Sequence, residues 1–315
     1  MEYQPLVSII IITYNSSEYV VETLDSALAQ TYPNVEIIVT DDCSTDDTVA
    51  VCRQWISNHH DSGRHVNLVV AEHNTGVSGN CNRGFQSSHG EWIKVIAGDD
   101  MLAPTAIEDY ICYVRTYPEV CHMIANSVHF SGHLTDDDLM HPDRISKFLY
   151  RDTFSVKRQY AVITKTFFGS GPTYFIKAEA LKQVGGYDER FPMQEDYPLF
   201  IKMIGAGYKM MYLDKVTVYK RMVPTSIQYD KAQDCYFSKH QVRVISEYKM
   251  LYRKEALGSF WRLLHGISIS LQNAIIRAGN SKKSLKTRLL YLVYTSTDPF
   301  LWYARYIVLR NKLYQ

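Results

Sequence analysis

Two adjacent carboxylates, Asp99 and Asp100, follow the apolar run 93–97 and a glycine, Gly98. We interpret the run as a strand that turns sharply at the glycine, which tolerates backbone conformations closed to other residues. The carboxyl end of a strand is where open α/β sheets bind their ligands. Two neighbouring carboxylates repel each other, and Mg²⁺ is commonly held by one or two carboxylates together with phosphate oxygens. For such a pair alone, a solvated polar turn is the better interpretation, so the other motifs must decide.

Similar polar groups follow two other predicted strands near the start of the chain. The β-branched run 7–12 leads into a polar trio, residues 13–15, and the run 35–39 leads into an acidic pair, residues 41–42. Residues 1–117 alternate such strands with helices, which predicts a parallel sheet with helices on both faces. Because the carboxyl ends of parallel strands meet at one edge, we expect these polar clusters to converge in one crevice.

A second acidic pair, Glu195-Asp196, precedes a predicted helix in the less regular region that follows. A carboxylate at that point could simply complement the helix dipole. We also expect short strands at 123–125 and 173–176 and a helix at 178–184 before this pair, and a strand at 209–219 after it. The acidic run 136–138 is typical of a solvated loop.

Charge is spread unevenly over the 315 residues, 46% of which are apolar. Residues 239–315 carry 14 Lys/Arg against 3 Asp/Glu, whereas residues 1–238 carry 20 against 30. A basic module of this kind faces nucleic acid or an anionic membrane, and no nucleic-acid reader motif is present. Helices on a membrane surface and a helical subdomain with a solvated basic face fit equally well. The basic and aromatic residues of the tail are Lys282, Lys283, Lys286, Arg288, Arg305, Arg310 and Lys312, and Tyr291, Tyr294, Phe300, Trp302, Tyr303 and Tyr306.

The six cysteines show no CxxC pair and no metal-binding spacing. Together with the lack of a signal-peptide pattern, this leads us to expect reduced thiols in a cytoplasmic protein. The sequence has no stretch of 18 uninterrupted apolar residues, so we expect no transmembrane helix.

Six motifs together resemble the family 2 glycosyltransferases of GT-A fold in order and spacing, over about residues 5–220. The resemblance implies an inverting transferase that uses a nucleotide-activated sugar, most often a UDP-sugar, with Mg²⁺ or Mn²⁺. It suggests bacterial O-antigen or capsule assembly at the cytoplasmic face of the inner membrane, on a saccharide acceptor of a class that includes polyprenyl-diphosphate-linked saccharides. The motifs are Val7–Asn15, Asp41-Asp42, Asn74–Gly84, Asp99-Asp100, Val184–Phe191 and Glu195-Asp196.

The fold that we expect is α/β: a Rossmann-like, mostly parallel sheet with helices on both faces, plus a C-terminal helical extension. Residues 1–117 would form the nucleotide-sugar-binding half of a GT-A domain. Residues 118–231 would form its acceptor-binding and catalytic-base half, and residues 232–315 a basic, aromatic-rich helical region.

Matched residue by residue, the family's functional carboxylates fall on the two acidic pairs. Asp99 is expected to face the ribose, and Asp100 to hold the cation against the diphosphate. Asp196 matches the catalytic base, with Glu195 as the next candidate. An inverting displacement needs a base for the acceptor hydroxyl and a Lewis acid at the leaving diphosphate, hence two carboxylate sites with different roles. Residues 169–173 match the region near the donor sugar and acceptor.

Two positions depart from the family pattern. Cys81 stands where an Arg is frequent, with Arg83 two residues on, and Met222 stands where a His is frequent. Arg221 or Lys220 could supply positive charge to the diphosphate instead. The nucleotide-sugar contacts implied by the resemblance are Thr13, Tyr14 and Asn15 around the base and ribose, Asp42 on the uracil, and Gly76, Asn82, Arg83, Asp99 and Arg221.

Two other classes of protein stay open. A sugar nucleotidyltransferase usually shows a Gly-rich phosphate loop with a basic residue after the first strand, and residues 13–17 contain neither. A binding or scaffold protein without activity would fit the departures at Cys81 and Met222, whereas the intact carboxylates at 42, 99, 100 and 196 argue against it. Because one fold hosts many functions, the site residues carry the argument.

Overall fold

The computed structural model describes residues 3–131, 154–164, 171–222, 234–237, 258–298, 301–303 and 305–306. The chain forms two compact units, one of residues 1–159 with 169–222 and one of residues 160–168 with 223–315. The expected boundaries at 117/118 and 231/232 stay predictions. Several predicted features lie outside the described residues: the loop 136–138, residues 169–170, and the tail residues Phe300, Arg310 and Lys312.

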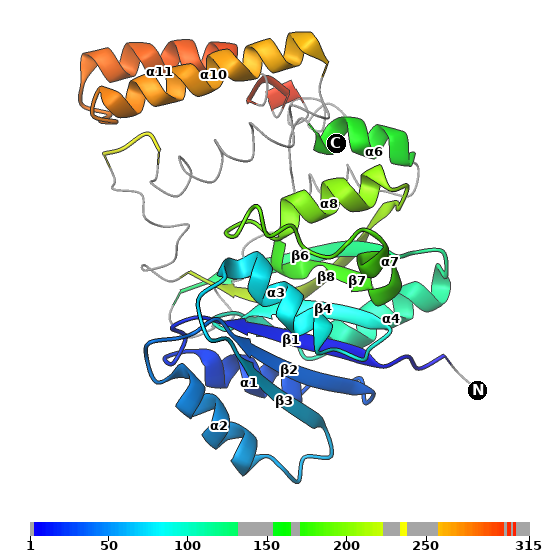
Figure 1. The fold of residues 1–315 in the computed structure, drawn as a ribbon. Helices are drawn as coiled ribbons and strands as arrows, with labels where there is room; N and C mark the ends of the chain where they lie inside the picture. Colours follow the sequence, from blue (N-terminus) through cyan, green and yellow to red (C-terminus); the bar gives the residue numbers. More distant parts are fainter. Residues whose placement is uncertain are drawn as a thin grey trace. The chain divides into compact units, whose positions relative to one another are not determined.

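An eight-stranded sheet runs through the described part of the first unit (Figure 1). Its strands are β1 (Val7–Thr13), β2 (Val35–Asp41), β3 (His65–Val70), β4 (Trp92–Ala97), β5 (Met101–Leu102), β6 (His122–Phe130), β7 (Phe175–Lys177) and β8 (Met210–Arg221). They lie in the order β3-β2-β1-β4-β7-β6-β8-β5. The pairs β1–β2, β1–β4, β2–β3 and β6–β8 are parallel, whereas β7 is antiparallel to β4 and β6, and β5 to β8. The predicted mostly parallel sheet is confirmed.

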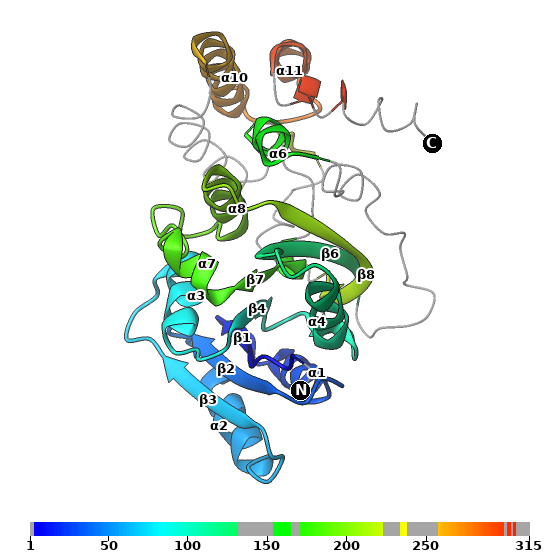
Figure 2. The same cartoon turned by 90° about the vertical axis from the view of Figure 1, so that its right-hand side faces the viewer.

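Helices cover both faces of this sheet (Figure 2). They are α1 (Val20–Leu28), α2 (Thr48–Asn58), α3 (Gly76–Gln86), α4 (Ala106–Thr116), α7 (Ala178–Gln183) and α8 (Asp196–Gly205). A further helix, α6 (Val156–Ile163), lies between β6 and β7 in the chain. Alternate residues of a strand point to opposite faces. Ile11 of β1 belongs to the apolar cluster that contains Leu24 of α1 and Ile107 of α4. On the other face, Ile10 lies so close to α3 that any side chain at Gly84 would overlap it.

Three parallel strands end side by side at one edge of the sheet. Thr13 of β1 is paired with Asp41 of β2, and Ile12 of β1 with Ala97 of β4. The polar residues that follow these strands therefore emerge at the same edge, as their position after parallel strands predicts.

Two strands are longer than the sequence pattern indicates. β6 has 9 residues where the pattern predicts three, and β8 continues to Arg221. Polar residues such as Asn126 break the apolar pattern of β6, yet Asn126 is only 3% exposed. Its amide accepts from Tyr212 Oη and donates to Asp214 Oδ1 at 3.2 Å, so internal partners satisfy it. The strand expected at 173–176 is β7, preceded by a 3₁₀ turn, η2 (Gly171–Thr173).

Two helices, α10 (Ser259–Arg277) and α11 (Leu285–Thr297), pack against each other in the second unit. Gly279 and Asn280 reverse the chain between them with φ angles of 97° and 54°. Ser284 caps α11 by accepting from the backbone N–H of Thr287. The predicted C-terminal helical extension is therefore present.

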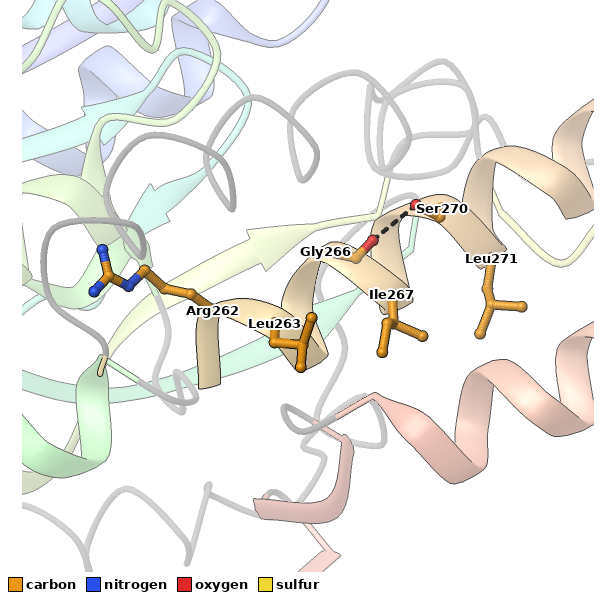
Figure 3. Close-up of a pocket in the computed structure, with 6 residues that line it drawn as sticks. All are labelled: Arg262, Leu263, Gly266, Ile267, Ser270 and Leu271. Atoms are coloured by element: carbon orange, nitrogen blue, oxygen red, sulfur yellow. Dashed lines mark hydrogen bonds between the residues drawn. The ribbon is translucent and has the colours of Figure 1, made fainter. Parts of the chain in front are cut away.

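The surface of this helical pair is apolar and basic. An open groove along α10 is lined by Arg262, Leu263, Gly266, Ile267, Ser270 and Leu271 (Figure 3). Residues 258–298 contain 6 Lys/Arg and one acidic residue, Asp298, whose carboxylate is buried and accepts from Ser268 Oγ. Within the described residues, no helix combines the length and apolar character needed to cross a membrane. The exposed large apolar side chains are Phe260, Leu263, Ile267, Leu285, Leu289, Leu292, Val293, Trp302 and Tyr306.

Candidate active site

Asp99 and Asp100 occupy the turn directly after β4. The turn is closed by a hydrogen bond from Asp100 N to Ala97 O at 3.1 Å, and Asp100 is 3% exposed. Its Oδ1 accepts from the backbone N–H of Arg221 at 2.9 Å. Burial, followed by the neighbouring charge of Asp99, raises the pKa of Asp100 to about 7, and burial also raises the pKa of Asp99. The pair is thus a concentrated negative site that favours a cation.

Arg221 supports this turn from β8. Its Nη2 lies 2.6 Å from Glu22 Oε2, and its Nε donates to Asp99 O at 3.0 Å. The guanidinium carbon also lies 4.6 Å from the ring centroids of both Tyr19 and Phe130. Cation–π contacts of this kind are favourable, and more so away from water. Arg221 therefore lies beside the acidic pair, while these contacts direct its side chain into the protein; its role at the diphosphate stays a prediction.

The second acidic pair lies at the start of α8. Both carboxylates are half-buried, and Asp196 Oδ1 accepts from Tyr197 N at 2.6 Å. Burial, and then the charge of Asp196, raises the pKa of Glu195 to about 8. Burial likewise raises the pKa of Asp196. A carboxylate with a raised pKa is a stronger base, and a neutral Glu195 beside it would leave Asp196 as the group that accepts a proton.

One lysine links the two acidic pairs. The pKa values of Asp99 and Asp100 are raised by burial, and the positive charge of Lys220 on β8 partly offsets that increase. It has the same effect on the pKa values of Glu195 and Asp196. Hydrogen bonds also join the edge of the sheet to the segment that leads to the second pair: Ser78 Oγ of α3 donates to Phe191 O at 2.7 Å, and Ser78 N donates to Pro192 O at 3.3 Å.

The Asp99-Asp100 turn fits a hard divalent cation. Oxygen ligands and an uncompensated negative charge are what Mg²⁺ or Mn²⁺ requires. Among the described residues, no three His, Cys, Asp or Glu side chains come together as a complete metal site. An ion at this turn would take its remaining ligands from water and from ligand phosphates, which is how Mg²⁺ is usually bound.

Of the polar trio of residues 13–15, Thr13 is buried, whereas Tyr14 and Asn15 are exposed. Thr13 is 2% exposed, and its hydroxyl donates to Asp41 Oδ2 at 2.8 Å. Asn15, with a φ of 52°, accepts at Oδ1 from Thr45 N at 2.8 Å. Thr13 and Asn15 thereby join the loop after β1 to the loop after β2. Tyr14 is 49% exposed between them and can offer its ring to a base.

The carboxylate of Asp42 accepts hydrogen bonds from the start of α3. This buried carboxylate accepts from Thr75 Oγ1 at 2.7 Å and from Gly76 N at 2.7 Å. Arg83 Nη2 completes the set at 3.2 Å. Gly76 has a φ of 79°, and any side chain there would overlap Pro192. These contacts fix the beginning of α3 close to the segment that leads to Glu195; the role of Asp42 on a uracil stays a prediction.

Asn82 and Cys81 face the segment before the second acidic pair. The amide of Asn82 accepts from Tyr187 N at 2.8 Å and donates to Tyr187 O at 3.0 Å. Cys81 is completely buried, and burial, followed by the charges of Glu195 and Asp196, raises the pKa of its thiol. The thiol that stands in place of the family's Arg therefore stays neutral near the second acidic pair.

The sequence motifs assign no role to Lys94, a completely buried lysine in β4. Its position within the apolar run 93–97 could have marked it in the sequence as a residue with a specific partner, because lysines are almost never fully buried without one.

The profile described as Glycosyl transferase family 2 matches residues 8–185, more than half of the chain. The chain belongs to this family. An uncharacterized glycosyltransferase of Rickettsia typhi is 29% identical over 226 residues, which cover 70% of this chain and 65% of that protein. The chain thus spans less than two thirds of this relative. Escherichia coli WfaP, named UDP-Glc:alpha-D-GlcNAc-diphosphoundecaprenol beta-1,3-glucosyltransferase, is 27% identical over 233 residues, 73% of this chain and 82% of WfaP.

Solved structures share the fold at lower identity. Staphylococcus aureus TarS 1-349 in complex with UDP-GlcNAc has a TM-score of 0.60 and 18% identity, covering 97% of this chain and 88% of that one. The mannosyltransferase PcManGT from Pyrobaculum calidifontis, in complex with GDP-Man and Mn²⁺, has a TM-score of 0.56 and 19% identity, covering 98% and 87%. The predicted GT-A fold is confirmed.

Proposed function

We propose that this family 2 glycosyltransferase moves a sugar from a UDP-sugar to an acceptor hydroxyl with inversion, and that Asp196 is its general base. The observation that carries the proposal is geometric: Asp42, at the end of β2, fixes the start of α3, and Ser78 of α3 donates to Phe191 O and Pro192 O in the segment that leads to Glu195. These contacts support one site that contains both acidic pairs. A single displacement needs such a site, with a base on one side of the sugar and a charged group for the diphosphate on the other. The UDP donors in the names of WfaP and the TarS complex support a UDP-sugar.

The residues of this chain would divide the work as follows. Asp196 accepts the proton of the acceptor hydroxyl as the new bond forms, and the protonated Glu195 beside it keeps the pair from carrying two charges. Asp100 and Asp99 would hold Mg²⁺ or Mn²⁺, which when bound stabilises negative charge on the leaving diphosphate. The positive charge of Lys220 acts on the carboxylates of both acidic pairs. The Mn²⁺ in the PcManGT structure supports a divalent cation.

The acceptor that we propose is a lipid-linked saccharide of surface-polysaccharide assembly, reached from the cytoplasmic leaflet. The diphosphoundecaprenol in the name of WfaP supports this acceptor class. The described helices α10 and α11 expose large apolar side chains, and their surface charges are basic, a combination that suits anionic lipid.

Flotation tests the lipid part of this proposal. The full chain should float with vesicles of anionic phospholipid and less with zwitterionic vesicles. The double variant Lys286→Glu/Arg288→Glu should float less, whereas a matched reversal of two exposed lysines in the first unit, Lys182→Glu/Lys215→Glu, should float like the parent. Equal flotation of all three proteins would contradict the proposal that the basic surface of α10 and α11 binds anionic lipid.

Thermal unfolding and turnover with UDP-, GDP- and dTDP-sugars and Mn²⁺ test the enzymatic part. A ligand that binds the folded state raises the melting temperature. Asp196→Asn should keep this stabilisation and lose turnover by roughly 10²–10⁴-fold, the usual contribution of a general base. The control is Asp47→Asn, an exposed aspartate that makes no capping hydrogen bond to α2. Undiminished turnover in Asp196→Asn would move the role to Glu195, and no response to any nucleotide would favour an inactive scaffold.

A further inference from the structure

Lys94 lies in the middle of the sheet, in the strand that leads to Asp99 and Asp100. It is 0% exposed. A lysine ammonium has three N–H donors, and three backbone carbonyls accept from Nζ. These belong to Val95 at 3.1 Å, Tyr174 at 3.4 Å and Pro172. Burying an amine is unfavourable unless its donors are used, so an apolar side chain would suit this strand better if only packing mattered.

Two of these carbonyls, those of Pro172 and Tyr174, belong to the segment 171–174, which consists of η2 and the residue before β7. The carbonyl between them, that of Thr173, accepts from the hydroxyl of Tyr110. Three successive carbonyls are therefore held by side chains of β4 and α4, where no strand ladder is available to hold them.

The same segment borders the second acidic pair. The backbone of Gly171 lies directly against Asp196: a methyl group built at Gly171 would overlap Asp196 Oδ2. The segment is thus fixed by Lys94 through its carbonyls and makes contact with Asp196 at Gly171. A shift of the segment would change the space in which the Asp196 carboxylate stands.

We propose that Lys94 is a positioning residue for Asp196, because its hydrogen bonds to Pro172 O and Tyr174 O hold the segment 171–174 against that carboxylate. Being fully buried, Lys94 touches no substrate and acts through Pro172, Tyr174 and Gly171. This inference rests on the proposed role of Asp196 as the general base. A misplacement of about 1 Å at a reacting group can lower a rate by roughly 10²-fold, so the effect is measurable.

A double-mutant cycle tests the inference on the full chain. Lys94→Met keeps the length of the side chain and removes all three donors. We expect kcat to fall roughly 10–100-fold. The affinity for UDP with Mn²⁺ should not weaken, since the hydrogen bonds of Lys94 end on Val95, Pro172 and Tyr174 and the loss of a positive charge near Asp100 does not disfavour a cation. On the Asp196→Asn background, Lys94→Met should lower kcat no further, because residues that act as a unit are not additive.

The cycle separates the two ideas. If Asp196→Asn alone leaves kcat unchanged, the proposed base is wrong. If Asp196→Asn lowers kcat but Lys94→Met leaves it unchanged, or lowers it by the same factor on both backgrounds, Asp196 stays the base and the positioning role of Lys94 is overturned. An equal loss of UDP affinity and kcat would also overturn it, by showing a general loss of structure.

Hydrogen exchange gives a readout that needs no turnover. In Lys94→Met, peptides covering residues 171–177 should exchange faster than in the parent, whereas peptides of β1 should not change. Unchanged exchange at 171–177 would show that the hydrogen bonds of Lys94 do not stabilise this segment. Should Lys94→Met fail to fold, Lys94→Gln is measured in its place. It retains an amide donor on a shorter stem, so we expect the same pattern with a smaller fall in kcat, and additivity with Asp196→Asn would again overturn the inference.

Discussion

Arg221 Nη2 lies 2.6 Å from Glu22 Oε2, an ion pair between residues 199 positions apart in the chain. The Arg221 side chain is 3% exposed and that of Glu22 is 40% exposed. Because Arg221 also donates to Asp99 O at 3.0 Å, the ion pair connects α1 with the turn that carries both acidic residues. Glu22 is thus a structural neighbour of the site that no sequence motif contains.

Glu22→Gln should therefore affect both stability and nucleotide binding. The change removes the negative partner of a nearly buried guanidinium, and we expect the free energy of unfolding to fall by about 1–3 kcal/mol. The affinity for UDP with Mn²⁺ should fall as well, since the Asp99-Asp100 turn loses part of its support. Urea unfolding and calorimetric titration measure the two effects. Glu119→Gln, at an exposed glutamate, is the control. Parent-like values in both measurements would contradict the supporting role.

Gly171→Ala should displace Asp196, because the added methyl group would overlap its Oδ2. We expect kcat to fall at least about tenfold, by the same misplacement argument, with the affinity for UDP unchanged. Gly266→Ala on α10 is the matched control, since nothing lies within 4 Å of the position that its methyl group would take. A parent-like kcat in Gly171→Ala would mean that the carboxylate is free to move without effect.

Asp100→Asn should shift stability and ligand response in opposite directions. It removes a buried charge that lies beside Asp99, while the amide oxygen can still accept from Arg221 N. The ligand-free protein should therefore melt at a higher temperature than the parent, as expected when a functional site keeps unfavourable charges together. Metal-dependent stabilisation by UDP should be lost. Differential scanning fluorimetry with Mn²⁺ or with EDTA measures both, and full metal-dependent stabilisation of the variant would exclude Asp100 as a ligand.

Glu36 should control stability in acid. It is 4% exposed and accepts from Ser8 Oγ and His89 N, each at 2.6 Å. Burial opposes its charge, but these hydrogen bonds outweigh burial and hold the pKa of Glu36 below its ordinary value. A lowered pKa in the folded state means that the stabilisation is complete above the pKa of the unfolded chain and is lost as pH falls through the folded value.

Urea unfolding between about pH 3 and 7 tests this pH dependence, since carboxylates of this kind lose their stabilising charge in that range. Glu36→Gln should be less stable than the parent at neutral pH, and the difference should shrink as the solution becomes more acidic. Glu119→Gln, at an exposed glutamate, should follow the parent. A constant difference across the whole range would show that the charge of Glu36 contributes nothing.

The first half of the sheet and the acidic motifs can be predicted from local sequence patterns. Continuous apolar runs predict the strands at 7–12, 35–39 and 93–97, and the structure has β1, β2 and β4 within one or two residues of these ranges. Local patterns suffice here because a strand buried on both faces must be apolar at every position. The order of strands then predicts that the residues after β1, β2 and β4 meet at one edge.

Local patterns do not show which motif residues are exposed to a ligand and which are hydrogen-bonded within the protein; that depends on the folded chain. Thr13, Asn15 and Asp42 carry motif positions, yet their hydrogen bonds join loops to one another. The ion pair of Arg221 with Glu22 and the hold of Lys94 on Pro172 join segments far apart in the chain. No periodicity records such contacts, because they depend on the register and order in which the strands pair. The residue types therefore indicate the chemistry of the site. The positions of these side chains depend on long-range packing, which arises only in the folded chain.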